Sequence, residues 1–197
     1  MERLIGVDES LGNLVVGCDP GPERCALALV SYNGTFSIQG LAYPKWEAML
    51  GTDCKEYASV IPSCGSSYVF AYEKVTARYG AVPGATTFDT CRNAGVVVSA
   101  MVRAGVDQVF GLGTVDWRVA LGGRTNLKDS ETRAALIQIL GKDADAFITA
   151  EASRLKKAYG LEKPIGCHLR DAVGVAIGAY LMKRHGTPAS EREVWHD

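Results

Sequence analysis

The sequence predicts an α/β fold in which helices flank a mixed five-stranded sheet, and two observations carry the prediction. Near the N-terminus, three apolar runs follow one another with only tight turns between them, which is typical of antiparallel strands. Further along, strand-like apolar runs alternate with segments of helical periodicity, which is typical of parallel strands joined by helices. Both patterns in one chain indicate an α/β domain with a mixed sheet.

The first predicted strand ends in a single carboxylate. The apolar residues 14–18 lead to Asp19, the chain then breaks on Pro20-Gly21-Pro22, and a second apolar run covers residues 25–30. This pattern predicts a hairpin with an acid at the end of its first strand. Because an ionised acid is costly to bury unpaired, we expect water or a cation beside it. Asp8 follows a similar run, and we interpret it as a solvated residue.

Three more strands complete the predicted sheet. The Tyr32-Asn33-Gly34 turn leads to a third strand over residues 35–43, and residues 67–73 form a fourth strand that ends in Glu73. Residues 106–112 form the fifth. We expect the first and fourth strands, which both end in carboxylates, to lie at the centre of the sheet.

Five helices are predicted among and after these strands. They cover residues 86–104 and 115–121, two segments that begin near residues 129 and 143, and residues 167–185. In the first helix, the adjacent threonines at 86 and 87 are expected to cap the N-terminus, and the apolar spacing predicts a stripe buried against the sheet. That stripe consists of Phe88, Cys91, Gly95, Val98 and Val102.

The last predicted helix brings polar side chains to the sheet. Its first turn carries His168 and Asp171, which share a face because they are three residues apart. Residues 172–179 are all apolar or small, so we expect the helix to lie closely on the sheet. The predicted cluster consists of Asp19, Glu73, His168 and Asp171. Its oxygen-rich composition suits Mg²⁺ or Mn²⁺, although each member alone is commonplace as a cap, an edge charge or a core imidazole.

Composition indicates one ordinary globular domain. The chain has 197 residues, of which 47% are hydrophobic and 22% charged; we assign residues 13–185 to the domain, 1–12 to an N-terminal extension and 186–197 to a polar tail. No apolar run reaches the roughly 20 residues that span a bilayer, and no secretory signal is present, so we expect a cytoplasmic protein without membrane contact. The six cysteines lack a CxxC pair and are expected to be reduced and mostly buried.

Five stretches resemble, in order, the motifs of the RuvC family of Holliday junction resolvases. They are residues 17–21 (GCDPG), 72–75 (YEKV), 91–95 (CRNAG), 118–128 (RVALGGRTNLK) and 168–172 (HLRDA). The resemblance implies an RNase H-like fold, a homodimer and a metal-dependent endonuclease. Such an enzyme nicks two strands of a four-way DNA junction symmetrically and leaves 5′-phosphate and 3′-hydroxyl ends, in recombination and repair or in phage DNA processing.

The resemblance also assigns roles to single residues. Asp19, Glu73 and Asp171 match the family's carboxylates, and His168 matches a position that is Asp or His in its members. Together they would hold two Mg²⁺ ions roughly 4 Å apart, for which Mn²⁺ substitutes. Lys128 matches a basic residue that offsets charge in the transition state. Many members carry an aromatic wedge where this chain has a threonine at position 76.

Positive charge is concentrated near the motifs although the net charge is only −1. A near-neutral protein that binds DNA must gather its cations in one groove, so we expect these residues to contact phosphates. They are Lys74, Arg78, Arg92, Arg118, Arg124 and Lys128. A second group, Arg154, Lys156 and Lys157, is interpreted as a solvated helix face.

The predicted helix 86–104 offers a surface for the implied homodimer. Val96, Val97 and Ala100 lie partly off its predicted buried stripe, which would leave apolar surface for a second copy. The alternative is that neighbouring helices of the same chain cover them.

Two other functions remain open from the sequence. A related nuclease of the same fold that acts on other branched DNA or on RNA would keep the acids and change the groove. An actin-like or sugar-kinase-like ATPase module also places a strand, an Asp and a Gly turn against phosphate. It would need a second phosphate-binding hairpin and paired lobes, for which this chain is short.

Overall fold

The computed structural model describes residues 13–50, 57–61, 67–75, 84–106, 108–122 and 128–185, which contain a five-stranded sheet in the order β3-β2-β1-β4-β5. The strands are β1 (Leu14–Pro20), β2 (Cys25–Tyr32), β3 (Phe36–Ala42), β4 (Val69–Glu73) and β5 (Gln108–Leu112). The first three pair antiparallel, whereas β4 runs parallel to β1 and β5 runs parallel to β4. The predicted mixed sheet, with the two acid-bearing strands adjacent near its centre, is confirmed.

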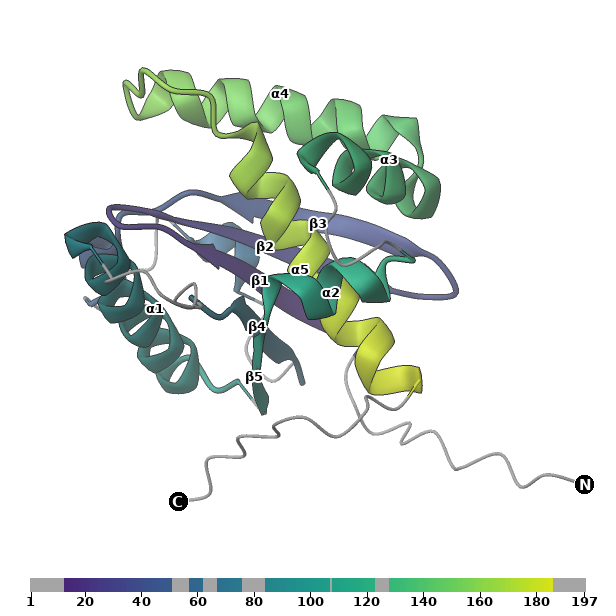
Figure 1. Cartoon of the computed structure of the whole chain (residues 1–197), viewed down its shortest axis with the longest axis horizontal. Helices are drawn as coiled ribbons and strands as arrows, with labels where there is room; N and C mark the ends of the chain where they lie inside the picture. Colours follow the sequence, from purple (N-terminus) through teal and green to yellow (C-terminus); the bar gives the residue numbers. More distant parts are fainter. Residues whose placement is uncertain are drawn as a thin grey trace, which may run out of the picture.

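Helices cover both faces of this sheet. They are α1 (Ala85–Arg103), α2 (Thr114–Ala120), α3 (Asp129–Leu140), α4 (Lys142–Ala158) and α5 (Gly166–His185), with the short 3₁₀ helices η1 (Trp46–Met49) and η2 (Ala58–Val60). Figure 1 shows α1 on one side of the sheet, and α5 with α2 crossing the other, with α3 and α4 beyond one end of α5. Two cores result, one between the sheet and α1 and one among the sheet, α5 and α2 to α4.

The close packing of α5 on the sheet, which its small residues predicted, is confirmed. A Cβ atom placed on Gly17 of β1 would lie 2.1 Å from the carbonyl oxygen of Ala172 and 2.7 Å from the backbone nitrogen of Ala176. On the other side of the helix, Gly174 and Gly178 allow the ring and backbone of Trp117 in α2 to approach. Glycines at these contacts therefore set the depth of α5 between the sheet and α2.

The buried face of α1 is opposite to the predicted one. The structure buries Asn93, Ala94, Val97, Ala100 and Met101, all on the sheet side of the helix. The predicted stripe lies mostly on the outer side. The helix instead turns toward the sheet the face that carries Asn93, whose amide donates to the loop after β1.

Phe88 is 64% exposed and Val102 56%, whereas Val98 is partly buried. The start of α1 also differs from prediction: Gly84 is its N-terminal cap residue, without a side-chain hydrogen bond, and Thr86 and Thr87 lie inside the helix.

The cysteines follow the prediction only in part. Cys18 and Cys25 are buried free thiols. Burial is the largest cause that raises the pKa of Cys18 well above its ordinary value, and a hydrogen bond with Cys25 is the second. Cys91 and Cys167 are exposed, contrary to expectation.

Residues 1–12 and 186–197 lie outside the described part of the chain. None of the described helices combines the length and hydrophobicity that crossing a membrane requires.

Candidate active site

The sheet topology brings the predicted acids to one place. Cys18 of β1 is paired with Tyr72 of β4, so the next residues of these parallel strands, Asp19 and Glu73, lie side by side. Because side chains alternate along a strand, Asp19 points to the same face as Gly17, which is the face that α5 covers. Both acids line a cavity of about 330 Å³ together with Pro20, Lys74, Val75, Thr90 and Thr114.

The first turn of α5 supplies the other two predicted residues. Nδ1 of His168 lies 2.8 Å from Oδ2 of Asp19, a contact that joins side chains 149 residues apart in the sequence. This hydrogen bond is the main cause that raises the pKa of the His168 imidazole. The ring also stacks on Tyr43 at the end of β3, with centroids 6.2 Å apart. Burial, and next the charge of Asp19, raises the pKa of Tyr43 to about 12, so its hydroxyl stays neutral.

Glu73 is fixed by two donors from α2 that the sequence did not indicate. The hydroxyl of Thr114 donates to Oε1, and the indole Nε1 of Trp117 donates to Oε2 at 3.3 Å. Burial is the largest influence on Glu73 and raises its pKa, while these hydrogen bonds favour the ionised form. The sequence gives no sign that Thr114 and Trp117 bind Glu73, because a Thr at a helix start is an ordinary capping residue and a Trp three residues later is an ordinary core residue.

Asp171 has the most perturbed carboxyl of the cluster. Burial raises its pKa to about 7, and the charges of Asp19 and Glu73 add to the shift. Arg118 opposes it: its Nη2 lies 4.0 Å from Oδ1 of Asp171 and 3.8 Å from Oδ1 of Asp129. Arg118 is therefore part of the acid cluster, where it offsets negative charge.

The chemistry of these residues fits a divalent cation, because several oxygen donors are held together at an energetic cost that a cation would offset. Within the described residues, however, no group of three or more His, Cys, Asp or Glu side chains has a metal-binding arrangement. His168 instead binds Asp19 directly. The metal ligand set Asp19, Glu73, His168 and Asp171 therefore stays a prediction.

The predicted basic residues divide into three groups. Lys74 lines the cavity beside Glu73, and Arg118 contacts Asp171. Lys128 is exposed at the N-terminal cap of α3, next to Asp129, which pairs with Arg118. Arg92 is exposed on α1, where it pairs with Asp89 at 3.3 Å and lies over the ring of Trp46. Arg78, Arg124 and the threonine at position 76 lie outside the described residues.

The turn after Asp19 is held by a buried amide. Asn93 is 1% exposed, and its Nδ2 donates to the carbonyl oxygens of Gly21, at 3.1 Å, and of Pro22. The sequence marked Asn93 only as part of a motif. Its place on the sheet side of α1 ties this helix to the loop that follows Asp19.

The perturbed Asp171 leads to a test on the metal-free protein. Its folded-state pKa is raised from 3.8 to about 7, so the stability present below pH 4 is lost as the pH rises through 7. We expect Asp171→Asn, which carries no charge, to be more stable than the wild type at pH 8 by roughly 2 to 4 kcal/mol, and equally stable at pH 4. Urea unfolding in EDTA at both pH values measures the difference. Asp143→Asn, on the exposed first turn of α4, is the control, and a pH-independent difference for Asp171→Asn would contradict the prediction.

No protein-family model matches the chain, and the search of curated proteins gives no match. Solved structures do match. Thermus thermophilus RuvC aligns with a TM-score of 0.61 at 21% identity, over 88% of this chain and 97% of that one. The same protein in complex with a Holliday junction substrate gives 0.57 at 18% identity, with the same coverage. The yeast mitochondrial Holliday junction resolvase Ydc2 gives 0.54 at 15% identity, over 90% of this chain and 82% of that one.

These likenesses extend over nearly the whole chain. At such low identity a structural match shows a common fold. The fold expected from the sequence is thus confirmed: this chain has the RNase H-like fold of the RuvC structures.

Proposed function

We propose that this chain is a metal-dependent, structure-selective DNA endonuclease that resolves four-way junctions. It would make paired symmetric nicks that leave 5′-phosphate and 3′-hydroxyl ends. The observation that carries the proposal is the convergence of Asp19, Glu73, Asp171 and His168 at one edge of an RNase H-like sheet. The likeness to structures of junction resolvases, one of them bound to junction DNA, supports the choice of substrate.

Asp19, Glu73, His168 and Asp171 would hold two Mg²⁺ ions. When bound, such ions supply an activated water and offset charge on the leaving oxygen. The chain itself orients the ligands: Thr114 and Trp117 fix the carboxylate of Glu73, and Tyr43 stacks on the imidazole of His168. Arg118 reduces the repulsion that Asp171 experiences from the other acids.

One assay tests the proposed function. A labelled immobile four-way junction, a Y-structure and a linear duplex are each incubated with the protein in Mg²⁺ or in EDTA. We expect symmetric cleavage of the junction in Mg²⁺ alone. Equal cleavage of the Y-structure would favour a nuclease for branched nucleic acids in general, and ATP hydrolysis without DNA cleavage would favour the ATPase alternative.

Lys128 is proposed to act mainly in the transition state. It is exposed at the start of α3, next to Asp129, the acid that pairs with Arg118. We expect Lys128→Ala to lower the single-turnover cleavage rate about 100-fold and junction affinity by about threefold or less, because its contact strengthens as charge develops on the phosphate. Lys157→Ala, on the exposed side of α4, should change neither. Equal losses in rate and affinity would mean that Lys128 only binds the DNA backbone and has no special role in the transition state.

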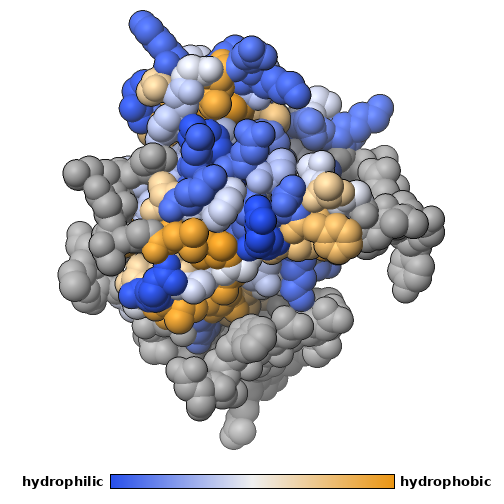
Figure 2. All heavy atoms as spheres, turned by 90° about the vertical axis from the view of Figure 1, so that its left-hand side faces the viewer, coloured by the Kyte–Doolittle hydropathy of each residue, from blue (hydrophilic) through white to orange (hydrophobic). Residues whose placement is uncertain are grey.

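We further propose that two copies associate through the exposed face of α1, since two equivalent strands of a junction must be cut. Val97 and Ala100, which the sequence pattern assigned to this surface, are instead buried against the sheet. Figure 2 faces the side of the molecule where α1 lies and shows apolar residues gathered there between polar ones. The exposed apolar side chains of this region include Phe88, Val102 and, from the neighbouring end of η1, Leu50.

Disruption of this surface should separate binding from paired cleavage. We expect Phe88→Glu to sediment as a monomer and to convert a supercoiled cruciform plasmid into nicked circles, whereas the wild type yields linear product. Phe147→Glu is the matched control, because Phe147 is an exposed phenylalanine of α4. A wild type that stays monomeric at micromolar concentration with junction bound would exclude the dimer.

A further inference from the structure

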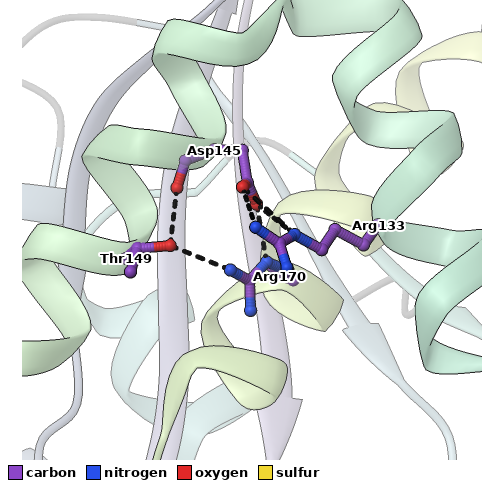
Figure 3. A network of polar contacts seen from close by, with 4 residues as sticks. All are labelled: Arg133, Asp145, Thr149 and Arg170. Carbon is purple, nitrogen blue, oxygen red and sulfur yellow. Dashed lines mark hydrogen bonds and ion pairs between the residues drawn. The ribbon is translucent and has the colours of Figure 1, made fainter.

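A network of polar contacts joins three helices at one end of the molecule (Figure 3). Its centre is Asp145 in α4, which is 12% exposed and accepts hydrogen bonds from two arginines. Arg170 of α5 donates through Nε to Oδ1 at 2.9 Å, and Arg133 of α3 donates through Nε and Nη2 to Oδ2 at 3.1 and 2.5 Å. Thr149, one turn further along α4, accepts from Nη2 of Arg170 at 3.0 Å.

These contacts have the properties of a rigid connection. Arg170 is only 17% exposed, and its guanidinium engages two side chains one helical turn apart, so its plane is fixed in direction. The hydrogen bond from Arg133 is the largest influence that lowers the pKa of Asp145, which keeps the carboxylate charged between the two arginines. Such a partly buried, charge-assisted network contributes more to the stability of the fold than an exposed ion pair does.

The network acts on the turn of α5 that carries the candidate ligands. Arg170 follows His168 by two residues and directly precedes Asp171, in a helix that begins only at Gly166. Consecutive helical residues point about 100° apart, so Arg170 faces α4 while Asp171 faces the acid cluster. A rotation of this turn that broke the Arg170 contacts would also move Asp171 and His168.

The same turn of α5 also meets the sheet, because Nδ1 of His168 lies 2.8 Å from Oδ2 of Asp19 in β1. Asp171 faces the acid cluster, where Nη2 of Arg118 lies 4.0 Å from its Oδ1. Leu169 of this turn is fully buried, as is Ala172 directly after Asp171. The contacts of Arg170 with Asp145 and Thr149 fix the turn on the side that faces α4.

We infer that Asp145 and Arg170 are positioning residues that hold the first turn of α5, and with it His168 and Asp171, in the geometry needed to bind the metal ions. The part of this inference that concerns metal binding rests on the proposed nuclease function. The part that concerns the order of the α5 turn does not. Removal of a direct hydrogen-bond partner of a metal ligand commonly changes metal affinity or activity by about 10- to 100-fold, so residues that act on the ligands through their helix are expected at the lower end of this range.

The main variant is Asp145→Asn, which keeps the size of the side chain and removes the charge that both arginines share. Arg133→Gln is the graded variant, because it removes the α3 contact and leaves the Asp145–Arg170 pair. Glu151→Gln is the matched control, because Glu151 pairs with Arg154 at 2.8 Å and both residues of this pair lie in α4.

Two measurements on the full chain test the inference. In amide hydrogen exchange without metal, Asp145→Asn should speed exchange of residues 167–171 at least about tenfold relative to residues 174–179. In junction cleavage, it should raise the Mg²⁺ concentration for half-maximal rate about tenfold. Junction affinity in EDTA should stay within about twofold. Arg133→Gln should give smaller changes in both, and Glu151→Gln should match the wild type.

The outcomes separate this inference from the proposed function. If Asp145→Asn lowers the unfolding temperature and speeds exchange in α4 without a selective effect at residues 167–171, the network only clamps α3 to α4 and the inference is wrong. An unchanged Mg²⁺ requirement with faster exchange at 167–171 would overturn the metal-positioning part. If the wild type cleaves no junction at all, the proposed function fails, while hydrogen exchange still decides whether the network holds the α5 turn.

Discussion

Asp19→Asn, Glu73→Gln and Asp171→Asn are each expected to lower the rate of junction cleavage by at least about 1,000-fold and to leave junction binding within about threefold. The neutral amides keep the shape of the side chains and remove the charge that would hold divalent cations. Under the proposed function, DNA binding would depend on the cations around the groove and not on these acids, so it should persist or increase slightly. Single-turnover cleavage in Mg²⁺ and junction binding in EDTA measure the two effects.

A matched substitution separates the site from general loss of charge. Asp143→Asn removes an exposed acid from the first turn of α4 and should leave both measurements unchanged. Asp8 lies in the N-terminal run that resembles the end of β1. Wild-type cleavage by Asp19→Asn together with loss in Asp8→Asn would show that the wrong acid was assigned to the site.

Gly17→Ala is expected to destabilise the protein by about 3 kcal/mol or more and to abolish cleavage at the same time. The new Cβ would lie 2.1 Å from the carbonyl oxygen of Ala172, so either β1 or α5 must move. Overpacking of a rigid core commonly costs about 1 to 3 kcal/mol, and here the opposing atoms belong to backbone that cannot rotate away. Displacement of α5 would also move His168 and Asp171 away from Asp19.

The control for this variant is Gly95→Ala. Gly95 lies inside α1. Among the described residues, no atom outside the neighbouring backbone of its own helix lies within 4 Å of the position that a Cβ would occupy there, so alanine should stabilise the helix by about 0.5 to 1 kcal/mol. Urea unfolding of both variants gives the comparison. A Gly17→Ala protein as stable as the wild type would mean that α5 does not pack on β1 as closely as described.

Local patterns in the sequence predicted the strands and helices and the positions of the acids within them. The hairpin of β1 and β2 follows from apolar runs around a Pro-Gly-Pro break, and the positions of Asp19 and Glu73 at the strand ends follow from where those runs stop. The three-residue spacing of His168 and Asp171 placed both on one face of α5. These features depend on neighbours in sequence, which is why period and turn chemistry predict them.

Contacts between distant elements were decided only by the tertiary structure. Which face of α1 is buried depends on partners outside the helix: Val97 and Met101 pack against the sheet, and the amide of Asn93 binds the loop after β1. The hydrogen bonds from Thr114 and Trp117 join α2 to Glu73 of β4, and the contact between Arg170 and Asp145 joins α5 to α4; no periodicity in the sequence relates these elements. Such side chains look like ordinary caps and surface charges in sequence, because their role depends on partners that the folded chain alone brings within hydrogen-bonding distance.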